Sequence, residues 1–140
     1  MEIRDATFQD LEAVLPIMHK AHEQSVFKDL DMSEVAVQRN YVTAICFDDG
    51  FAKVVEHKGK VTGCMVGLMA ESHFGQRYAQ DLFLYSVGGT DKLVKAFCLW
   101  ARDRGARFVQ ITDMSESQRY QNLLTTLGLK PCGTNFVGVI

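Results

Sequence analysis

The segment that most constrains the fold lies at residues 81–105, where a strand pattern runs directly into a glycine pair and a helix pattern follows. The stretch DLFLYSV is apolar enough for a buried central strand. Gly88 and Gly89 interrupt it, and apolar side chains then recur at helical spacing as far as Trp100. Gly105 follows in a position typical of a helix C-terminal cap. A strand that leads straight into a helix is typical of α/β domains.

The Gly88-Gly89-Thr90 turn predicts an anion site. Glycine lets the backbone adopt positive φ and approach a ligand closely, and the first N–H groups of a helix have no intrahelical acceptor. Together with the helix dipole, these features favour a phosphate or pyrophosphate. The alternative is a plain tight turn in which Thr90 caps the helix. Asp91 would compete for the same N–H groups, and Lys92 is the candidate to offset its charge.

The rest of the chain shows strand and helix patterns without a repeat or a linker. We expect strands at 1–6, 51–56, 61–69, 108–112 and within 129–140, helices after Thr7 and Ser33 and at 91–104 and 116–126, and a loop at 71–78. This order indicates an α/β fold with a mixed central sheet and helices on both faces. The 140 residues fit a single domain, 1–140.

Composition limits the partners and the cellular compartment that we expect for the chain. The formal net charge of -2 leaves no basic surplus, so nucleic-acid binding is not indicated. No stretch approaches the roughly 18 apolar residues of a membrane span, and the charged N-terminus lacks a signal-peptide pattern. The four cysteines lie far apart, which fits reduced thiols and predicts a cytoplasmic protein. His19 and His22 lie one turn apart, but no further ligand cluster accompanies them, so we expect no metal.

The order of the expected elements resembles the GNAT (Gcn5-related N-acetyltransferase) superfamily over essentially the whole chain, and the resemblance is specific in the C-terminal two-thirds. The resemblance rests on the apolar strand and glycine turn, on WARDRGA near the end of the following helix, on the strand FVQIT, and on the ending LLTTLGLKPCGTNFV. The phrases LVKAFCLWARDRGA and GLKPCGTNFV look most similar to the compact branch found in bacteriophage genomes. The resemblance implies an N-acetyltransferase that uses acetyl-CoA and acts on a primary amine of a small molecule or protein. A phage origin would place it in the host cytoplasm or the virion.

Cofactor contacts follow from the same resemblance. In this family the central strand pairs through its backbone with the pantetheine arm, which implies roles for Phe83, Leu84, Tyr85 and Val87. The turn holds the pyrophosphate, a role that falls here to Gly88, Gly89, Thr90 and Lys92. The family's turn is usually longer and preceded by Arg or Gln, whereas Tyr85 lies three positions before Gly88.

Acyl transfer to an amine needs a base and benefits from an acid. Asp81 begins the central strand, where many family members place a catalytic carboxylate, and the edge of an apolar cleft would raise its pKa. The alternative is a solvated strand-end aspartate. The family's tyrosine acid would fall at Leu124, so Tyr120, four residues earlier on the same helix, is the substitute unless it is a packed aromatic.

Glu71, His73 and Tyr78 precede the central strand, where the family often binds its acceptor, and they are candidates for the rim of the acceptor site. A plain surface loop is the alternative. The final stretch, TNFVGVI, is apolar enough to pair with a neighbouring copy, so a homodimer is a hypothesis.

Two functional hypotheses stay open. One is the acetyl-CoA-dependent enzyme. The other is a non-catalytic GNAT-like binding or structural module, such as a phage virion or host-interaction protein, which the short turn and Leu124 would fit.

Overall fold

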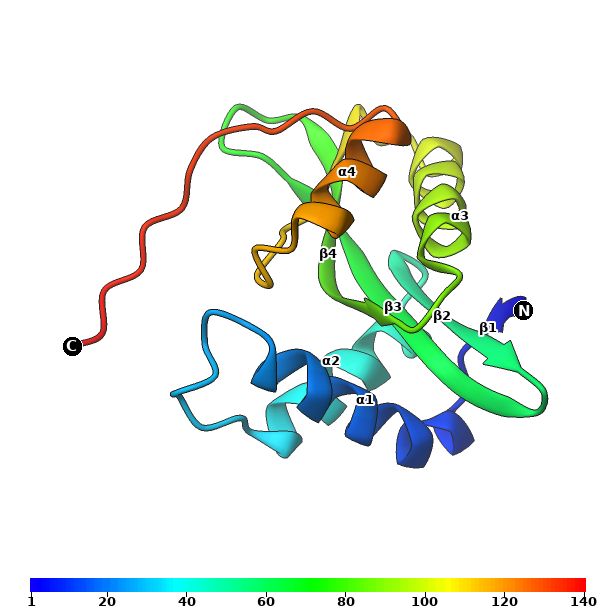
Figure 1. Cartoon of the computed structure of the whole chain (residues 1–140). Coiled ribbons are helices and arrows are strands. Elements are labelled where there is room, and N and C mark those ends of the chain that lie inside the picture. Colours follow the sequence, from blue (N-terminus) through cyan, green and yellow to red (C-terminus); the bar gives the residue numbers. More distant parts are fainter.

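The computed structural model describes all residues from Met1 to Ile140 and contains one five-stranded sheet in the order β1-β2-β3-β4-β5 (Figure 1). Neighbouring strands are antiparallel except β4 and β5, which are parallel. The mixed sheet expected from the sequence is therefore confirmed. The strands are β1 (Glu2–Asp5), β2 (Gly50–His57), β3 (Lys60–Glu71), β4 (Arg77–Ser86) and β5 (Phe108–Gln110).

Helices cover both faces of the sheet, as expected (Figure 1). A short 3-10 helix, η1 (Phe8–Asp10), leads into α1 (Leu11–Glu23), which lies with α2 (Glu34–Cys46) on one face. The opposite face carries α3 (Thr90–Asp103) and α4 (Gln118–Thr126). None of these helices has both the length and the apolar character needed to cross a membrane.

The core divides into two clusters, one on each side of the sheet. On the α1/α2 side, Val14, Tyr41 and Val66 are buried together. The Tyr41 hydroxyl donates a hydrogen bond to the Thr7 carbonyl oxygen at 2.6 Å, so the one polar atom of this large side chain is satisfied. On the α3 side the core is aromatic, and Phe97 packs against Phe51 with ring centroids 5.2 Å apart.

Strand β4 contains a β-bulge that the apolar run DLFLYSV did not indicate. Opposite β3, Val66 pairs with Phe83 but Gly67 pairs with Asp81, so Leu82 is an extra residue on β4. A bulge reverses which face each later side chain takes. Phe83 therefore packs on the α1/α2 cluster and Leu84 on the α3 cluster, while Leu82 is exposed.

Strands β4 and β5 pair only where they begin. Tyr78, Ala79 and Gln80 lie opposite residues 108–110, and there β5 ends while β4 continues to Ser86. The edge of β4 from Asp81 onward has no neighbouring strand on that side, so its backbone polar groups are open to a ligand.

Two expectations about secondary structure, and the alternative in which Thr90 caps α3, were wrong. The 71–78 segment is not all loop, because β3 extends to Glu71 and β4 already begins at Arg77. Thr90 is the first helical residue and not the cap, a position held by Gly89 with φ 72°. Residues 129–140 form no strand, because no part of the sheet in this chain lies beside them to complete the backbone hydrogen bonds.

Candidate functional site

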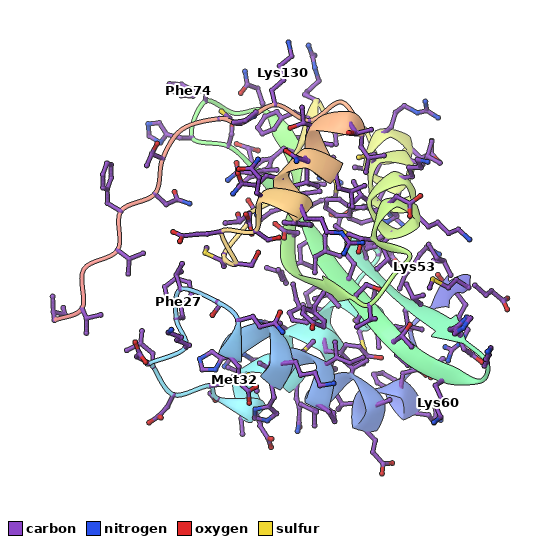
Figure 2. The ribbon with its side chains drawn as sticks, viewed as in Figure 1. Phe27, Met32, Lys53, Lys60, Phe74 and Lys130 are labelled. Carbon is purple, nitrogen blue, oxygen red and sulfur yellow. The ribbon has the colours of Figure 1, made fainter.

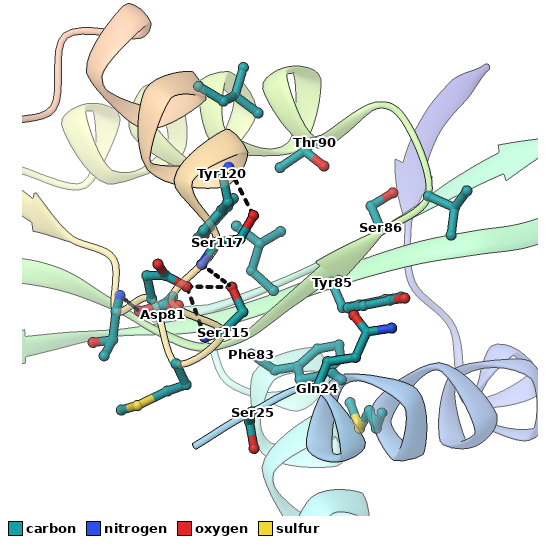
Figure 3. Close-up of a pocket in the computed structure, with 18 of the residues that line it drawn as sticks. Gln24, Ser25, Asp81, Phe83, Tyr85, Ser86, Thr90, Ser115, Ser117 and Tyr120 are labelled. Carbon is teal, nitrogen blue, oxygen red and sulfur yellow. Dashed lines mark hydrogen bonds between the residues drawn. The ribbon is translucent and has the colours of Figure 1, made fainter. Parts of the chain in front are cut away.

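A cleft of about 1190 Å³ opens between the two halves of the molecule. Its walls are the free edge of β4, the glycine turn, the end of α1 with the loop after it, the segment after β5, and α4 (Figure 3). The cleft thus lies where β4 and β5 diverge, which is where open sheets commonly bind ligands. The part of the chain that follows α1 supplies a wall that the sequence patterns did not indicate, with Gln24, Ser25, Phe27 and Met32 among its residues.

The residues predicted to contact a pantetheine arm all lie along this cleft. Phe83, Leu84, Tyr85 and Val87 line it, and they belong to or follow the part of β4 that has no neighbouring strand. An extended ligand can add to such an edge through main-chain hydrogen bonds. The bulge at Leu82 lies at the inner end of this edge, and a bulged residue drops out of the strand ladder.

The glycine turn has the geometry of an anion site. Gly88 and Gly89 have φ of 82° and 72°, a left-handed conformation that glycine adopts without strain. The five backbone N–H groups of residues 88–92 donate to no acceptor in the protein. Ser86 Oγ donates to the Gly88 carbonyl, which fixes the turn. The turn therefore presents free donors and the positive end of the α3 dipole to the cleft.

Asp91 and Lys92 behave differently from expectation. The Asp91 carboxylate does not cap its own helix but lies 3.8 Å from the Lys95 ammonium, so it leaves the N–H groups of the turn free. The Lys92 ammonium donates to the Met1 carbonyl at 3.1 Å, and Lys92 is not among the residues that line the cleft. The structure thus brings Gly88, Gly89 and Thr90 to the cleft but not Lys92.

Asp81 lies at the point where β4 and β5 separate, and only 8% of it is exposed. Its Oδ1 accepts hydrogen bonds from the Thr112 N–H at 3.0 Å and from Gln80 Nε2 at 2.9 Å. Its Oδ2 accepts no hydrogen bond within the protein, and it is not among the fully buried polar atoms that lack a partner. Because Asp81 lines the cleft, Oδ2 is open to it. Burial raises the pKa of the carboxyl to about 6, although the hydrogen bonds from Thr112 and Gln80 work in the opposite direction. Asp81 is therefore not the solvated strand-end aspartate of the alternative interpretation.

Tyr120 lies on the wall of the same cleft, above Asp81 in Figure 3. Its hydroxyl makes no hydrogen bond within the protein. Burial and the charges of Asp81 and Asp113 raise the pKa of the Tyr120 hydroxyl, so it stays protonated. Leu124, where the family resemblance would place a tyrosine, does not line the cleft.

The predicted acceptor rim lies elsewhere. Glu71 and His73 are exposed around the β3–β4 loop, whose tip carries Phe74 (Figure 2). Tyr78 stacks on Phe108 with ring centroids 4.9 Å apart, across the β4–β5 pair. None of the three predicted rim residues lines the cleft, because they sit at the end of β4 that β5 closes.

Sequence patterns missed the residues that hold Asp81. Gln80 projects its amide onto Asp81 and Thr112 supplies a backbone donor from the chain that follows β5. Gln80 and Thr112 lie close together because β4 and β5 pair up to this point and then separate. No local sequence pattern shows which strands pair, so the sequence did not indicate these two residues. The described residues include no group of three or more His, Cys, Asp or Glu side chains placed to hold a metal ion.

The fold is that of acetyltransferases of known structure. A probable acetyltransferase superposes with a TM-score of 0.75 at 14% identity over 100% of this chain and 98% of its own. The aminoglycoside N-acetyltransferase AAC(6')-Iy in complex with CoA gives 0.74 at 12% identity, over 99% and 98%. A transcriptional regulator from Bacillus halodurans C-125 gives 0.78 at 16%, over 99% of both chains.

Sequence comparison adds nothing to these structural matches. No family model matches the chain, and no curated protein matches it in sequence. Because the structural identities are low, the likeness concerns the fold alone. That fold is the GNAT acyl-CoA N-acyltransferase fold, as the sequence predicted.

Proposed function

We propose that this protein is an N-acetyltransferase that transfers an acetyl group from acetyl-CoA to a primary amine of a small molecule or a protein. The observation that carries the proposal is the convergence of three features on one cleft. These are the open edge of β4, the turn with unpaired N–H groups, and a buried carboxylate with one free oxygen. Solved acetyltransferases of this fold, one of them in complex with CoA, support it.

The residues present fit acetyl-CoA. The N–H groups of residues 88–92 suit its pyrophosphate, and Gly88 and Gly89 let that group approach the backbone. The β4 edge from Phe83 to Tyr85 suits the amides of its pantetheine arm. When bound, acetyl-CoA supplies an acetyl group activated as a thioester.

Asp81 is the proposed base. Oδ1 is held by two hydrogen bonds, so Oδ2 has a fixed direction into the cleft. At neutral pH the carboxyl is ionised, since its pKa is about 6. It can then accept a proton from an ammonium group, directly or through water, and it is more basic there than an ordinary aspartate.

Two further groups complete the proposed machinery. We infer that the backbone N–H at the Leu82 bulge, a residue that has no partner in the β3–β4 register and lines the cleft, donates to a carbonyl oxygen beside Asp81. The Tyr120 hydroxyl, protonated and without a protein partner, is placed to donate a proton to a departing thiolate. The acceptor would enter along the wall formed by the loop after α1. The likeness to the phage-encoded branch of the superfamily and the cytoplasmic location stay predictions from the sequence.

A thermal-shift titration with acetyl-CoA tests the proposal. A ligand that binds only the folded chain raises its melting temperature, by an amount that grows with the ratio of ligand concentration to Kd. We expect stabilisation by acetyl-CoA and none by pantetheine or phosphate alone at equal concentration. No shift with millimolar acetyl-CoA would reject the enzyme and leave the non-catalytic module, an outcome that the engagement of Lys92 with Met1 would fit.

A further inference from the structure

The loop after α1 and the segment after β5 approach each other across the cleft (Figure 1). The Val26 N–H donates to the Met114 carbonyl oxygen with an N–O distance of 2.9 Å. No other hydrogen bond or ion pair joins residues 24–33 to the part of the chain beyond residue 47. A single backbone hydrogen bond, the Val26–Met114 link, therefore connects these two walls of the cleft.

The turn that presents the Val26 N–H is fixed by the side chain of Ser25. Ser25 Oγ donates to the His22 carbonyl at 2.8 Å and accepts from the Phe27 N–H at 3.1 Å. Hydroxyl-to-backbone hydrogen bonds of this kind hold a turn in one conformation. The Val26 N–H therefore leaves the loop in a defined direction.

On the opposite wall, Asp113 fixes the turn that carries the Met114 carbonyl. Asp113 Oδ1 accepts from the Ser115 N–H at 2.9 Å and from Ser115 Oγ at 2.6 Å, near the position of Ser115 in Figure 3. Asp113 Oδ2 accepts from Gln121 Nε2 at 2.9 Å, which ties the turn to α4. The donor and the acceptor of the link are thus both held by side-chain hydrogen bonds of their own.

The segment that accepts the link also holds Asp81. Met114 lies two residues after Thr112, whose N–H donates to Asp81 Oδ1 at 3.0 Å. Strand β5 ends at Gln110, so no strand pairing fixes Thr112. The Thr112 hydroxyl accepts only a long hydrogen bond, 3.5 Å, from Gln80. The position of the Thr112 N–H therefore depends on what holds the residues that follow it.

We propose that the loop after α1 positions Asp81 through the Val26–Met114 link, which holds the Thr112 N–H against the carboxylate. Val26 is a positioning residue, since it acts through Met114 and Thr112 and does not itself line the cleft. The role of Asp81 as a base rests on the proposed function, whereas the effect of the link on the carboxyl does not. Ser25 and Phe27, on either side of Val26, do line the cleft, so an acceptor bound against them would contact the loop that positions its base.

The pKa of Asp81 reports the position of Thr112. Burial raises this pKa, and the Thr112 N–H is the largest of the hydrogen-bonding causes that lower it, so losing that bond should raise the pKa further. No neighbouring charge contributes to the shift. The ionisable side chains that share the cleft are His22 at the end of α1, Tyr85 on β4, Asp91 on α3, Asp113 after β5, and Arg119 and Tyr120 on α4.

Val26→Pro tests the link, because proline has no N–H to donate. Amide hydrogen exchange at Thr112 should become about tenfold faster, and carbon NMR of the free protein should give an Asp81 pKa several tenths of a unit higher. The matched control is Asp31→Pro, which lies in the same loop and removes an N–H that donates to no acceptor in the protein. Both quantities should match those of the parent in the control.

Ser25→Ala is the second variant, and it decides the question if Val26→Pro does not fold in a circular-dichroism melt. It removes the hydroxyl that fixes the turn and keeps the Val26 N–H, so it should shift both quantities in the same direction by a smaller amount. Thr112 exchange or an Asp81 pKa that stays at the control value in the folded variants would overturn the proposal.

These measurements use the protein without acetyl-CoA, so they decide the proposal even if the chain is not an acetyltransferase. If it is one, the rising limb of the pH–rate profile should move upward in Val26→Pro by the same amount as the Asp81 pKa. A limb at the same pH in Val26→Pro and Asp31→Pro would contradict the proposal.

Discussion

The two ends of the cleft present different kinds of groups, side chains at one end and backbone N–H groups at the other. At the Asp81 end, side chains do the work, with Gln80 beside the carboxylate and Tyr120 facing it. At the glycine turn the free groups belong to the backbone, the N–H groups of residues 88–92, and the Lys92 ammonium donates to the Met1 carbonyl and does not line the cleft. The first end should therefore respond to changes of side-chain chemistry, whereas the second should respond only to changes that alter the backbone or fill its space.

The largest effect is expected from Asp81→Asn, which separates the two ends. Asparagine can still accept from Thr112 and Gln80, but it cannot accept a proton from an amine. We expect turnover to fall by about 10²–10⁴-fold while acetyl-CoA affinity changes little. Steady-state assay of thiol release, paired with calorimetry, gives both numbers. Unchanged turnover would remove Asp81 as the base.

The same substitution should stabilise the protein at neutral pH. Because the folded-state pKa of Asp81 is about 6 and the unfolded value is near 4, the native state binds more protons between those values, so stability falls as pH rises through this window. Asparagine has no charge to bury, so its advantage over Asp81 should be about 3 kcal/mol at pH 8 and small at pH 4. Urea unfolding at the two pH values measures the difference, and an equal effect at both would contradict it.

Tyr120→Phe should have a smaller effect. Thiolates leave readily, so loss of the proposed acid should reduce kcat by about tenfold and spare acetyl-CoA affinity. Tyr78→Phe is the matched control, since that ring stacks on Phe108 outside the cleft and should retain full activity. Equal activities of the two variants would show that the Tyr120 hydroxyl is not the acid.

Gln80→Met sharpens the account of how Asp81 is tuned. Loss of a hydrogen bond to the ionised carboxylate should raise the pKa of Asp81 and move the rising limb of the pH–rate profile upward by several tenths of a pH unit. Carbon NMR of the Asp81 carboxyl gives the same pKa without any turnover. If the pKa of Asp81 in the variant is unchanged or lower, Gln80 does not stabilise the charged form of the carboxyl.

The smallest effect is expected at Lys92. Since its ammonium donates to Met1 and does not line the cleft, Lys92→Met should change acetyl-CoA affinity by less than about twofold once surface screening is considered. A tenfold loss by calorimetry would show that Lys92 turns toward the phosphates when the ligand binds.

The sequence predicted the parts of the site that lie in one continuous segment. The strand, the glycine turn and the helix after it follow from local pattern between residues 81 and 105. Asp81 was expected at the start of the central strand, but it lies inside β4, which begins at Arg77. Gln80 and Thr112 act on Asp81 through the fork between β4 and β5, which depends on how distant segments pair. The Leu82 bulge was hidden because an extra apolar residue does not interrupt an apolar run.

The differences between the sequence-based expectations and the structure have a shared physical cause. The C-terminal stretch TNFVGVI has a strand pattern as good as that of β2, yet only β2 lies between two partners. The predicted rim residues Glu71, His73 and Tyr78 lie outside the cleft, and Tyr78 lies where β5 pairs with β4. Their role in acceptor binding stays a prediction. Local pattern describes what a segment can form, and its neighbours in the fold decide whether it forms and where it lies.

The most direct test of the central claim is an acetyl-CoA titration by calorimetry on the parent chain, Gly88→Asp and Gly75→Asp. Both glycines have φ of 82°, so both substitutions place a side chain on a left-handed backbone. A Cβ at Gly88 would also displace the flexible end of the Met1 side chain, whereas a Cβ at Gly75 meets no atom within 4 Å. Of the two glycines, only Gly88 lines the cleft. We predict micromolar binding to the parent and to Gly75→Asp, and binding at least tenfold weaker to Gly88→Asp. Equal affinity in all three proteins, or no binding to the parent, would contradict the account of the cleft as an acyl-CoA site.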